Sequence, residues 1–196
     1  MDARKSERCV AFLAADKIAE GSPREVAFAM KAALEADPGA AVRAFDEETA
    51  QPLEFDLRGS AADVAGRYGA DEPRGPGRPR LGVTAREVTL LPRHWEWLAA
   101  QPGGASVTLR KLVETASRAS ENADRARAAQ EKAYRFMAAA VGDQPGFEEA
   151  CRALFACDGE LFGEIACGWP TDLAAFATRL AGPAFEPSAA DLRRPG

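Results

Sequence analysis

The sequence predicts an α+β protein with a small N-terminal ββαββα module, a central strand-helix-helix segment and a C-terminal α-helical bundle. Three observations support this prediction. Strand-like apolar runs occur only in the first half of the chain, helical apolar spacing dominates the second half, and Gly- and Pro-rich stretches separate the parts. The chain has 196 residues, 46% of them hydrophobic, which is enough for one large domain or two small ones.

The N-terminal module is expected over residues 1–70. Residues 9–15 are typical of a short buried strand, and Ile18-Ala19 can return as its hairpin partner. Ser22-Pro23-Arg24-Glu25 is a helix-start signal, because the Ser22 hydroxyl can accept from the Glu25 amide while Glu25 reaches back. A helix with one apolar stripe should follow.

Two more strands and a short helix complete this module. We expect strands at residues 42–45 and 53–58, the second with clean apolar and charged alternation. The acidic run Asp46-Glu47-Glu48 lies in the turn between them and is interpreted as a solvated turn rather than a cation site. Ser60 is expected to cap the last helix.

Residues 71–83 form a predicted basic linker, because Pro and Gly are too dense there for a helix or a central strand. Its Gly77-Arg78-Pro79 core resembles an AT-hook, which implies contact with a narrow minor groove through arginine. Pro76 stands where that motif has arginine, so a solvated linker remains the alternative.

Charge is distributed unevenly along the chain. The net charge is −5, but residues 1–73, 74–118 and 119–196 carry −6, +5 and −4 respectively. A polyanion is therefore expected to contact the middle segment rather than the whole surface.

The central segment spans residues 84–118. Residues 86–91 are β-rich, Pro92 opens a helix with Trp95 on its apolar face, and Gly103-Gly104 ends the connection that follows. Ser106 is the expected N-cap of a second helix.

This order resembles the ribbon-helix-helix DNA-binding fold. The resemblance implies a homodimer whose paired strands enter the major groove, with a phosphate held at the start of the second helix. By position, the phosphate would meet Ala105, Ser106 and Val107, flanked by Arg110 and Lys111. The groove face of the strand would carry either Arg86, Val88 and Leu90 or Glu87, Thr89 and Leu91.

Two other geometries fit the same residues. In a helix-turn-helix, the second helix would enter the major groove with Thr108, Arg110 and Lys111 as its contacts. In a plain αα-hairpin, the tryptophans would be core residues and the arginines would be solvated.

The C-terminal bundle is expected over residues 119–182, and the tail from 183 to 196 is expected to be disordered. Apolar residues at helical spacing predict a helix over residues 122–141 and three shorter helices after it. Short loops between them favour antiparallel packing.

The motifs of most enzyme classes are missing from the sequence. There is no GxSxG, P-loop, GxGxxG after a strand or HExxH, and His94 is the only histidine. The four cysteines lack the spacing of a zinc site, so we expect neither a metal nor another cofactor. No apolar run is long enough to span a membrane, and reduced thiols favour the cytoplasm.

Most of the chain between residues 9 and 180 resembles a bacterial family, domain-of-unknown-function family 2239. The resemblance rests on Phe45-Asp46, Asp56-Leu57-Arg58-Gly59 and residues 77–83, 85–106, 133–137 and 145–150. It implies a bacterial cytosolic protein and implies no mechanism.

The leading functional hypothesis is a DNA-binding regulator that contacts duplex DNA as a homodimer. The candidate DNA-binding residues are Arg74, Arg78, Arg80, Arg86, Thr89, Ser106, Thr108, Arg110 and Lys111. The alternative is a protein-interaction module whose C-terminal helices dock a protein partner without nucleic acid.

Overall fold

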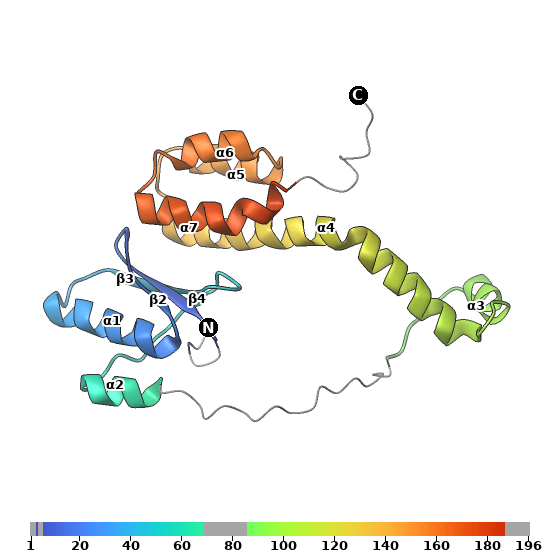
Figure 1. The fold of residues 1–196 in the computed structure, drawn as a ribbon, viewed down its shortest axis with the longest axis horizontal. Helices are drawn as coiled ribbons and strands as arrows, with labels where there is room; N and C mark the ends of the chain where they lie inside the picture. The colour runs from blue at the N-terminus through green and yellow to red at the C-terminus, as the bar shows by residue number, and fades with distance from the viewer. Residues whose placement is uncertain (1–2, 4–5, 69–85, 187–196) are drawn as a thin grey trace. The chain divides into compact units, whose positions relative to one another are not determined.

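The structure is a computed structural model that describes residues 3, 6–68 and 86–186. It contains a four-stranded antiparallel sheet and seven α-helices within these residues, so the predicted α+β class is confirmed (Figure 1). The predicted linker at 71–83 and residues 187–196 of the predicted disordered tail lie outside the described residues. The start of that tail is ordered instead, because Gly182–Ala184 form a 3₁₀ turn and Ala184 is buried in the core. In the described part of the chain, no helix has the length and hydropathy to cross a bilayer.

The sheet has the strand order β2-β1-β3-β4. Strands β1 (Cys9–Leu13) and β2 (Asp16–Gly21) form a hairpin whose turn lies at Ala14 and Ala15, two residues earlier than the sequence suggests. Ala14 has a φ of 51°, in the left-handed region that closes this tight turn. Strand β3 (Val42–Asp46) pairs with the other side of β1.

Helix α1 (Pro23–Ala36) follows β2 and begins as predicted. The Glu25 amide donates to Ser22 Oγ at 3.3 Å, and the Glu25 carboxylate accepts from the Ser22 amide at 2.8 Å. This capping box satisfies amides at the helix start that have no partner within the helix. Ser60 forms the same reciprocal arrangement with Asp63 at the start of α2 (Ala61–Arg67).

The predicted strand over residues 53–58 is largely wrong, because β4 is only Pro52–Leu53. Beyond it, polar groups bind locally instead of joining the sheet. The Asp56 amide donates to Tyr68 Oη at 2.6 Å, and the Asp56 carboxylate accepts from the Arg58 guanidinium. Side chains therefore bind the backbone groups that would have formed strand-to-strand hydrogen bonds in the strand predicted over residues 53–58.

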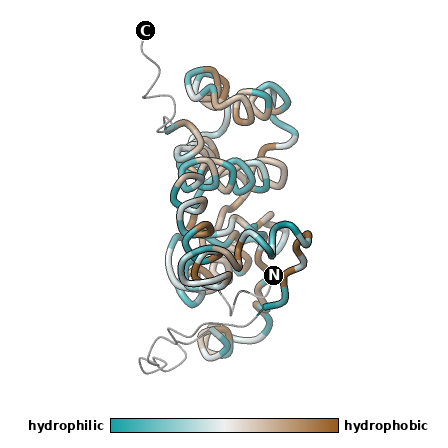
Figure 2. Tube along the Cα trace, turned by 90° about the vertical axis from the view of Figure 1, so that its right-hand side faces the viewer, coloured by the Kyte–Doolittle hydropathy of each residue, from teal (hydrophilic) through white to brown (hydrophobic). Residues whose placement is uncertain are grey.

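The C-terminal helices are α5 (Phe147–Phe155), α6 (Gly159–Ala166) and α7 (Thr171–Ala181), followed by a 3₁₀ turn. They lie along the C-terminal half of α4 (Gly104–Ala140) in Figure 1. Figure 2 shows apolar and polar residues alternating along the helices, as amphipathic packing requires.

Both faces of β1 are buried, each in a different core. Cys9 and Ala11 pack in one cluster with residues of α1 and α2, whereas Val10 and Phe12 pack in the other with α4 to α7. Successive strand residues point to opposite faces, so one short strand serves two layers.

The core beneath α4 is centred on aromatic rings. The Phe136 ring lies 5.8 Å from that of Phe12, 5.0 Å from that of Phe45 and 4.7 Å from that of Phe176, centroid to centroid. All four side chains are buried. The N-terminal sheet and the C-terminal helices therefore share one core, whereas the sequence predicts separate parts at residues 1–70 and 119–182.

Helix α4 is continuous over 37 residues, although the sequence suggested separate helices at 106–117 and 122–141. No Gly or Pro interrupts residues 105–140, and the Arg118–Glu114 ion pair at 2.6 Å supports the middle of the helix. The boundary expected at 118/119 thus falls inside a helix.

Contacts divide the chain into two compact units. The sheet–bundle unit comprises residues 1–72 and 125–196, and the hairpin unit comprises residues 73–124. The hairpin unit contains all nine candidate DNA-binding residues.

Candidate nucleic-acid interface

Helix α3 (Pro92–Ala99) and the start of α4 form a helical hairpin. The Gly104 amide donates to the Gln101 carbonyl at 2.9 Å, and Gln101 Nε2 donates to the Trp97 carbonyl at 3.1 Å. Gly103 and Gly104 have φ values of 90° and 74°, which glycine adopts without strain. The glycine pair thus completes the connection after Ala99, the last residue of α3, and Gly104 begins α4.

Ser106 is not the N-cap that the sequence predicts. Helix α4 begins at Gly104, so Ser106 lies within the first turn and its side chain is exposed. The reason is the turn geometry, because the two left-handed glycines end the loop earlier than a Ser-capped start would. The Ser106 carbonyl accepts from Arg110 Nε at 3.3 Å.

The cations of the hairpin unit are open to solvent. Arg86, Arg110 and Lys111 are exposed, and none forms an ion pair with a described residue. Glu114, the nearest acidic residue along α4, pairs with Arg118 at 2.6 Å rather than with Arg110 or Lys111. Arg93 was not among the predicted residues, although its place beside Pro92 in the basic segment could have indicated it. The Arg93 side chain is exposed, and its Nε donates to His94 Nε2 at 3.5 Å.

The remaining candidate residues differ in solvent exposure, and some lie outside the described part of the chain. Thr89 is exposed and Thr108 is half-buried. The linker residues Arg74, Arg78 and Arg80 lie outside the described residues.

Residues 86–91 do not form the predicted strand. A strand needs a neighbour for its hydrogen bonds, and no strand of the described chain pairs with this segment. The ribbon of the ribbon-helix-helix resemblance is therefore not confirmed by the fold of the described residues, whereas the two helices and the glycine turn are present.

The hairpin unit also exposes an unusual amount of apolar surface. Among the described residues 86–124, Leu98 alone is buried. The exposed large apolar side chains of this stretch are Val88, Leu91, Trp95, Trp97, Val107, Leu112 and Val113. Where such side chains are contiguous on a surface, they mark interaction sites in soluble proteins.

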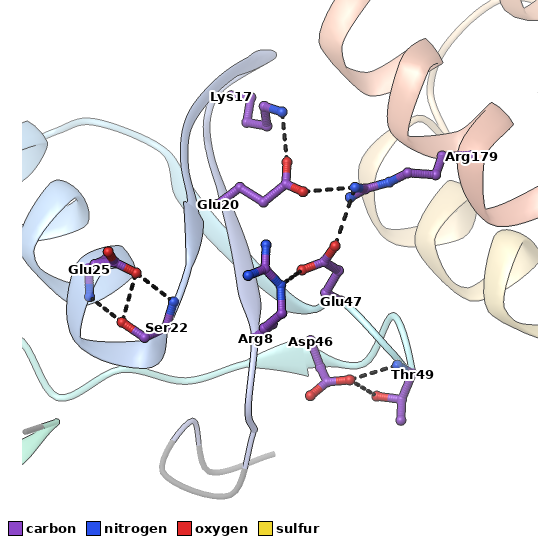
Figure 3. A network of polar contacts seen from close by, with 9 residues as sticks. All are labelled: Arg8, Lys17, Glu20, Ser22, Glu25, Asp46, Glu47, Thr49 and Arg179. Carbon is purple, nitrogen blue, oxygen red and sulfur yellow. Dashed lines mark hydrogen bonds and ion pairs between the residues drawn. The ribbon is translucent and has the colours of Figure 1, made fainter. Parts of the chain in front are cut away.

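A second polar site lies on the sheet–bundle unit. An open pocket of about 310 Å³ is lined by Glu7, Arg8, Asp46, Glu47 and Glu48. Two of its carboxylates have partners, since Thr49 donates to Asp46 and Arg8 Nε donates to Glu47 Oε2 at 2.7 Å (Figure 3). No group of three or more potential ligands that could hold a metal occurs in the described residues. Residues 47–49 form a turn.

The network beside this pocket joins β2 to α7. Glu20 accepts from Lys17 Nζ and from Arg179 Nη1, both at 2.7 Å, and Arg179 also lies 3.3 Å from Glu47 (Figure 3). Hydrogen bonds from Lys17 and Arg179 lower the pKa of Glu20 to about 2. These contacts stabilise the packing of the sheet against the helices, which is a structural role.

A family model described as "uncharacterized protein conserved in bacteria" (DUF2239) matches residues 8–181. The chain belongs to this family. The match covers both units of the DUF2239 fold, including the hairpin with its cations. No curated protein and no solved structure matches the chain.

Proposed function

We propose that this bacterial protein binds duplex DNA through the hairpin unit, in the manner of a cytoplasmic transcriptional regulator. The observation that carries the proposal is the set of exposed cations Arg86, Arg110 and Lys111, which lack acidic partners among the described residues of a chain with net charge −5. Unpaired cations on an acidic protein favour a localised polyanion contact.

The start of α4 suits a phosphate contact. Arg110 and Lys111 lie in its second turn, and the helix dipole adds partial positive charge at the same end. Thr108 can donate a hydroxyl hydrogen bond beside them. Such contacts position a protein on DNA and do not by themselves read the base sequence.

Two copies would double the number of phosphate contacts. We propose a homodimer, with Arg74, Arg78 and Arg80 of each linker adding further contacts to the backbone or the minor groove. The proposed role is binding and requires no catalytic step.

Fluorescence anisotropy with a labelled duplex tests the proposal. We expect Arg110→Glu and Lys111→Glu each to weaken binding, because each reverses the charge of an exposed cation without removing an ion pair. Arg24→Glu is the matched control, since Arg24 is exposed on α1 in the sheet–bundle unit and also has no ion pair with a described residue. Absence of wild-type binding at low salt would overturn the proposal.

A second candidate function is supported by a separate observation. Tyr134 and Phe155 are 44% and 54% exposed, and their rings lie 5.9 Å apart on α4 and α5. An exposed aromatic pair of this kind suits a protein partner. A Tyr134→Ala/Phe155→Ala variant that loses a specific co-purifying protein but keeps DNA affinity would favour this docking function.

A further inference from the structure

Helix α4 has an uncovered apolar seam in the hairpin unit. Every residue from Arg110 to Ala119 is exposed, and Leu112 is 47% and Val113 65% exposed. A helix with solvent on all sides is marginally stable in water, because helices normally depend on packing of an apolar face. The described chain supplies no such packing here.

The seam has the spacing of a coiled coil. Small or apolar residues alternate three and four apart along α4, at Leu109, Leu112, Ala116, Ala119, Ala123 and Ala126. The same register continues through Gln130, Ala133, Met137 and Ala140, where the last three side chains are buried in the sheet–bundle core. One register therefore covers a packed half and an unpacked half of the same helix.

We propose that a second copy of this chain covers the seam as an antiparallel helix, centred between Ser117 and Arg118. In this register Leu109 lies opposite the partner's Ala126, and Leu112 lies opposite the partner's Ala123. Each large side chain meets a small one, so the helix separation stays even along the pair. A parallel pair would stack leucine on leucine at one end and alanine on alanine at the other, which splays the helices.

The charges beside the seam are compatible with this arrangement. The positions next to it are uncharged up to residue 122, namely Thr108, Val113, Thr115, Ser120 and Asn122. No like charges therefore meet across the contact in this stretch. On one outer flank, the Asp124 carboxylate accepts from Ser120 Oγ of its own helix at 2.8 Å, and exposed Arg110 keeps the phosphate contact proposed above.

The other outer flank is basic throughout. Lys111, Arg118 and Arg125 recur every seven residues, and antiparallel pairing brings this flank of both copies to the same side. The pair then brings six cations to one side, which is complementary to a nucleic-acid backbone. Glu114 pairs with Arg118 at 2.6 Å and Glu186 lies 3.8 Å from Arg125, so Lys111 of each copy is the cation of this stripe without an ion pair to a described residue. This step rests on the proposed DNA binding, and it implies that DNA strengthens the pairing by neutralising the stripe.

The pairing excludes a shared two-stranded ribbon. The starts of α4 in the two copies would lie about 40 Å apart, given ~1.5 Å per residue. The segments at residues 86–91 would then be at opposite ends of the pair, and their hydrogen bonds could not form.

Disulfide trapping in the full-length protein tests the inference. Leu112→Cys and Ala123→Cys are made separately in a background with Cys157→Ser and Cys167→Ser, because both of these native thiols are exposed. In the antiparallel pair, residue 112 meets the partner's Ala123, but each position lies about 16 Å from its own copy. That separation is far beyond the ~7 Å limit of a disulfide.

We therefore expect a covalent dimer only when the two variants are mixed, with a higher yield when duplex DNA is added at low salt. A mixture of Glu114→Cys and Glu121→Cys is the matched control, because these positions share a level but point away from the seam. Efficient self-crosslinking of either seam variant, or a mixed yield no greater than the control with and without DNA, would overturn the pairing. A mixed crosslink that DNA does not affect would uphold the pairing and contradict the DNA function.

Discussion

Salt dependence is the sharpest quantitative test of the proposed DNA interface. Arg86, Arg110 and Lys111 are the exposed cations of the predicted set without an ion pair in the described residues, and two copies supply roughly six phosphate contacts. At ~0.9 per phosphate, log K against log salt should have a slope of about −5. Raising salt from ~50 to ~200 mM should then lower the affinity about a thousandfold.

The Arg110→Glu/Lys111→Glu double variant removes two of the three cations in each copy. We expect its slope to fall to about −2, since roughly two phosphate contacts remain in the dimer. The assay is anisotropy of a labelled duplex over a salt series, with circular dichroism to show that helix content is unchanged. Arg24→Glu should keep the wild-type slope, and an equal loss of slope in this control would refute a localised interface.

Three further predictions concern stability and reactivity. Phe136→Ala should lower the free energy of unfolding by about 3 to 5 kcal/mol, while exposed Phe155→Ala should cost less than about 1 kcal/mol, both measured by urea titration. Glu20→Gln should lower the free energy of unfolding by about 1 to 2 kcal/mol at pH 7 after solvent screening. Because folding lowers the pKa of Glu20, the difference in stability between wild type and variant should shrink as pH falls from about 4.5 to 2 and should persist at higher pH. A thiol reagent at pH 8 should label exposed Cys167 quickly and Cys9 only after unfolding. The reason is that burial of the Cys9 thiol and, to a smaller extent, the charge of Asp46 raise the pKa of Cys9 to about 11. Rapid labelling of native Cys9 would contradict its buried position.

Local signals predicted the starts of the helices well when one side chain could satisfy the backbone. Ser22 and Ser60 both form the capping boxes that their spacing to Glu25 and Asp63 implies. Such contacts involve residues three apart, so the sequence contains all the information they need. Ser106 has no acidic residue three positions later, and there the glycine turn decided the start of the helix.

Signals that depend on distant partners were less informative. Alternation over residues 53–58 predicts a strand, but Tyr68 and Arg67 bind that backbone instead. At residues 86–91 the same pattern has no neighbouring strand in the described chain. Periodicity identifies a face that can be buried and does not identify what buries it.

At the candidate site, too, the sequence indicates local features but not contacts between distant residues. The sequence located the basic segment and identified Arg86, Arg110 and Lys111, because charge and position are read directly from the chain. Their freedom from acidic partners could not be read in this way, since Arg179 is equally basic and yet pairs with Glu20 and Glu47. Only the fold distinguishes the two cases.

The sequence alone determined the α+β class, the helix starts that short-range hydrogen bonds define, and the location of positive charge. The tertiary structure decided that the sheet and the C-terminal helices share one core, that α4 is a single helix, and that its residues 110–119 are exposed in the described chain. The physical reason is how far apart the interacting residues lie along the sequence. Capping and charge depend on residues a few positions apart, whereas burial depends on surfaces that meet only after residues such as Phe12 and Phe136 are brought together by folding.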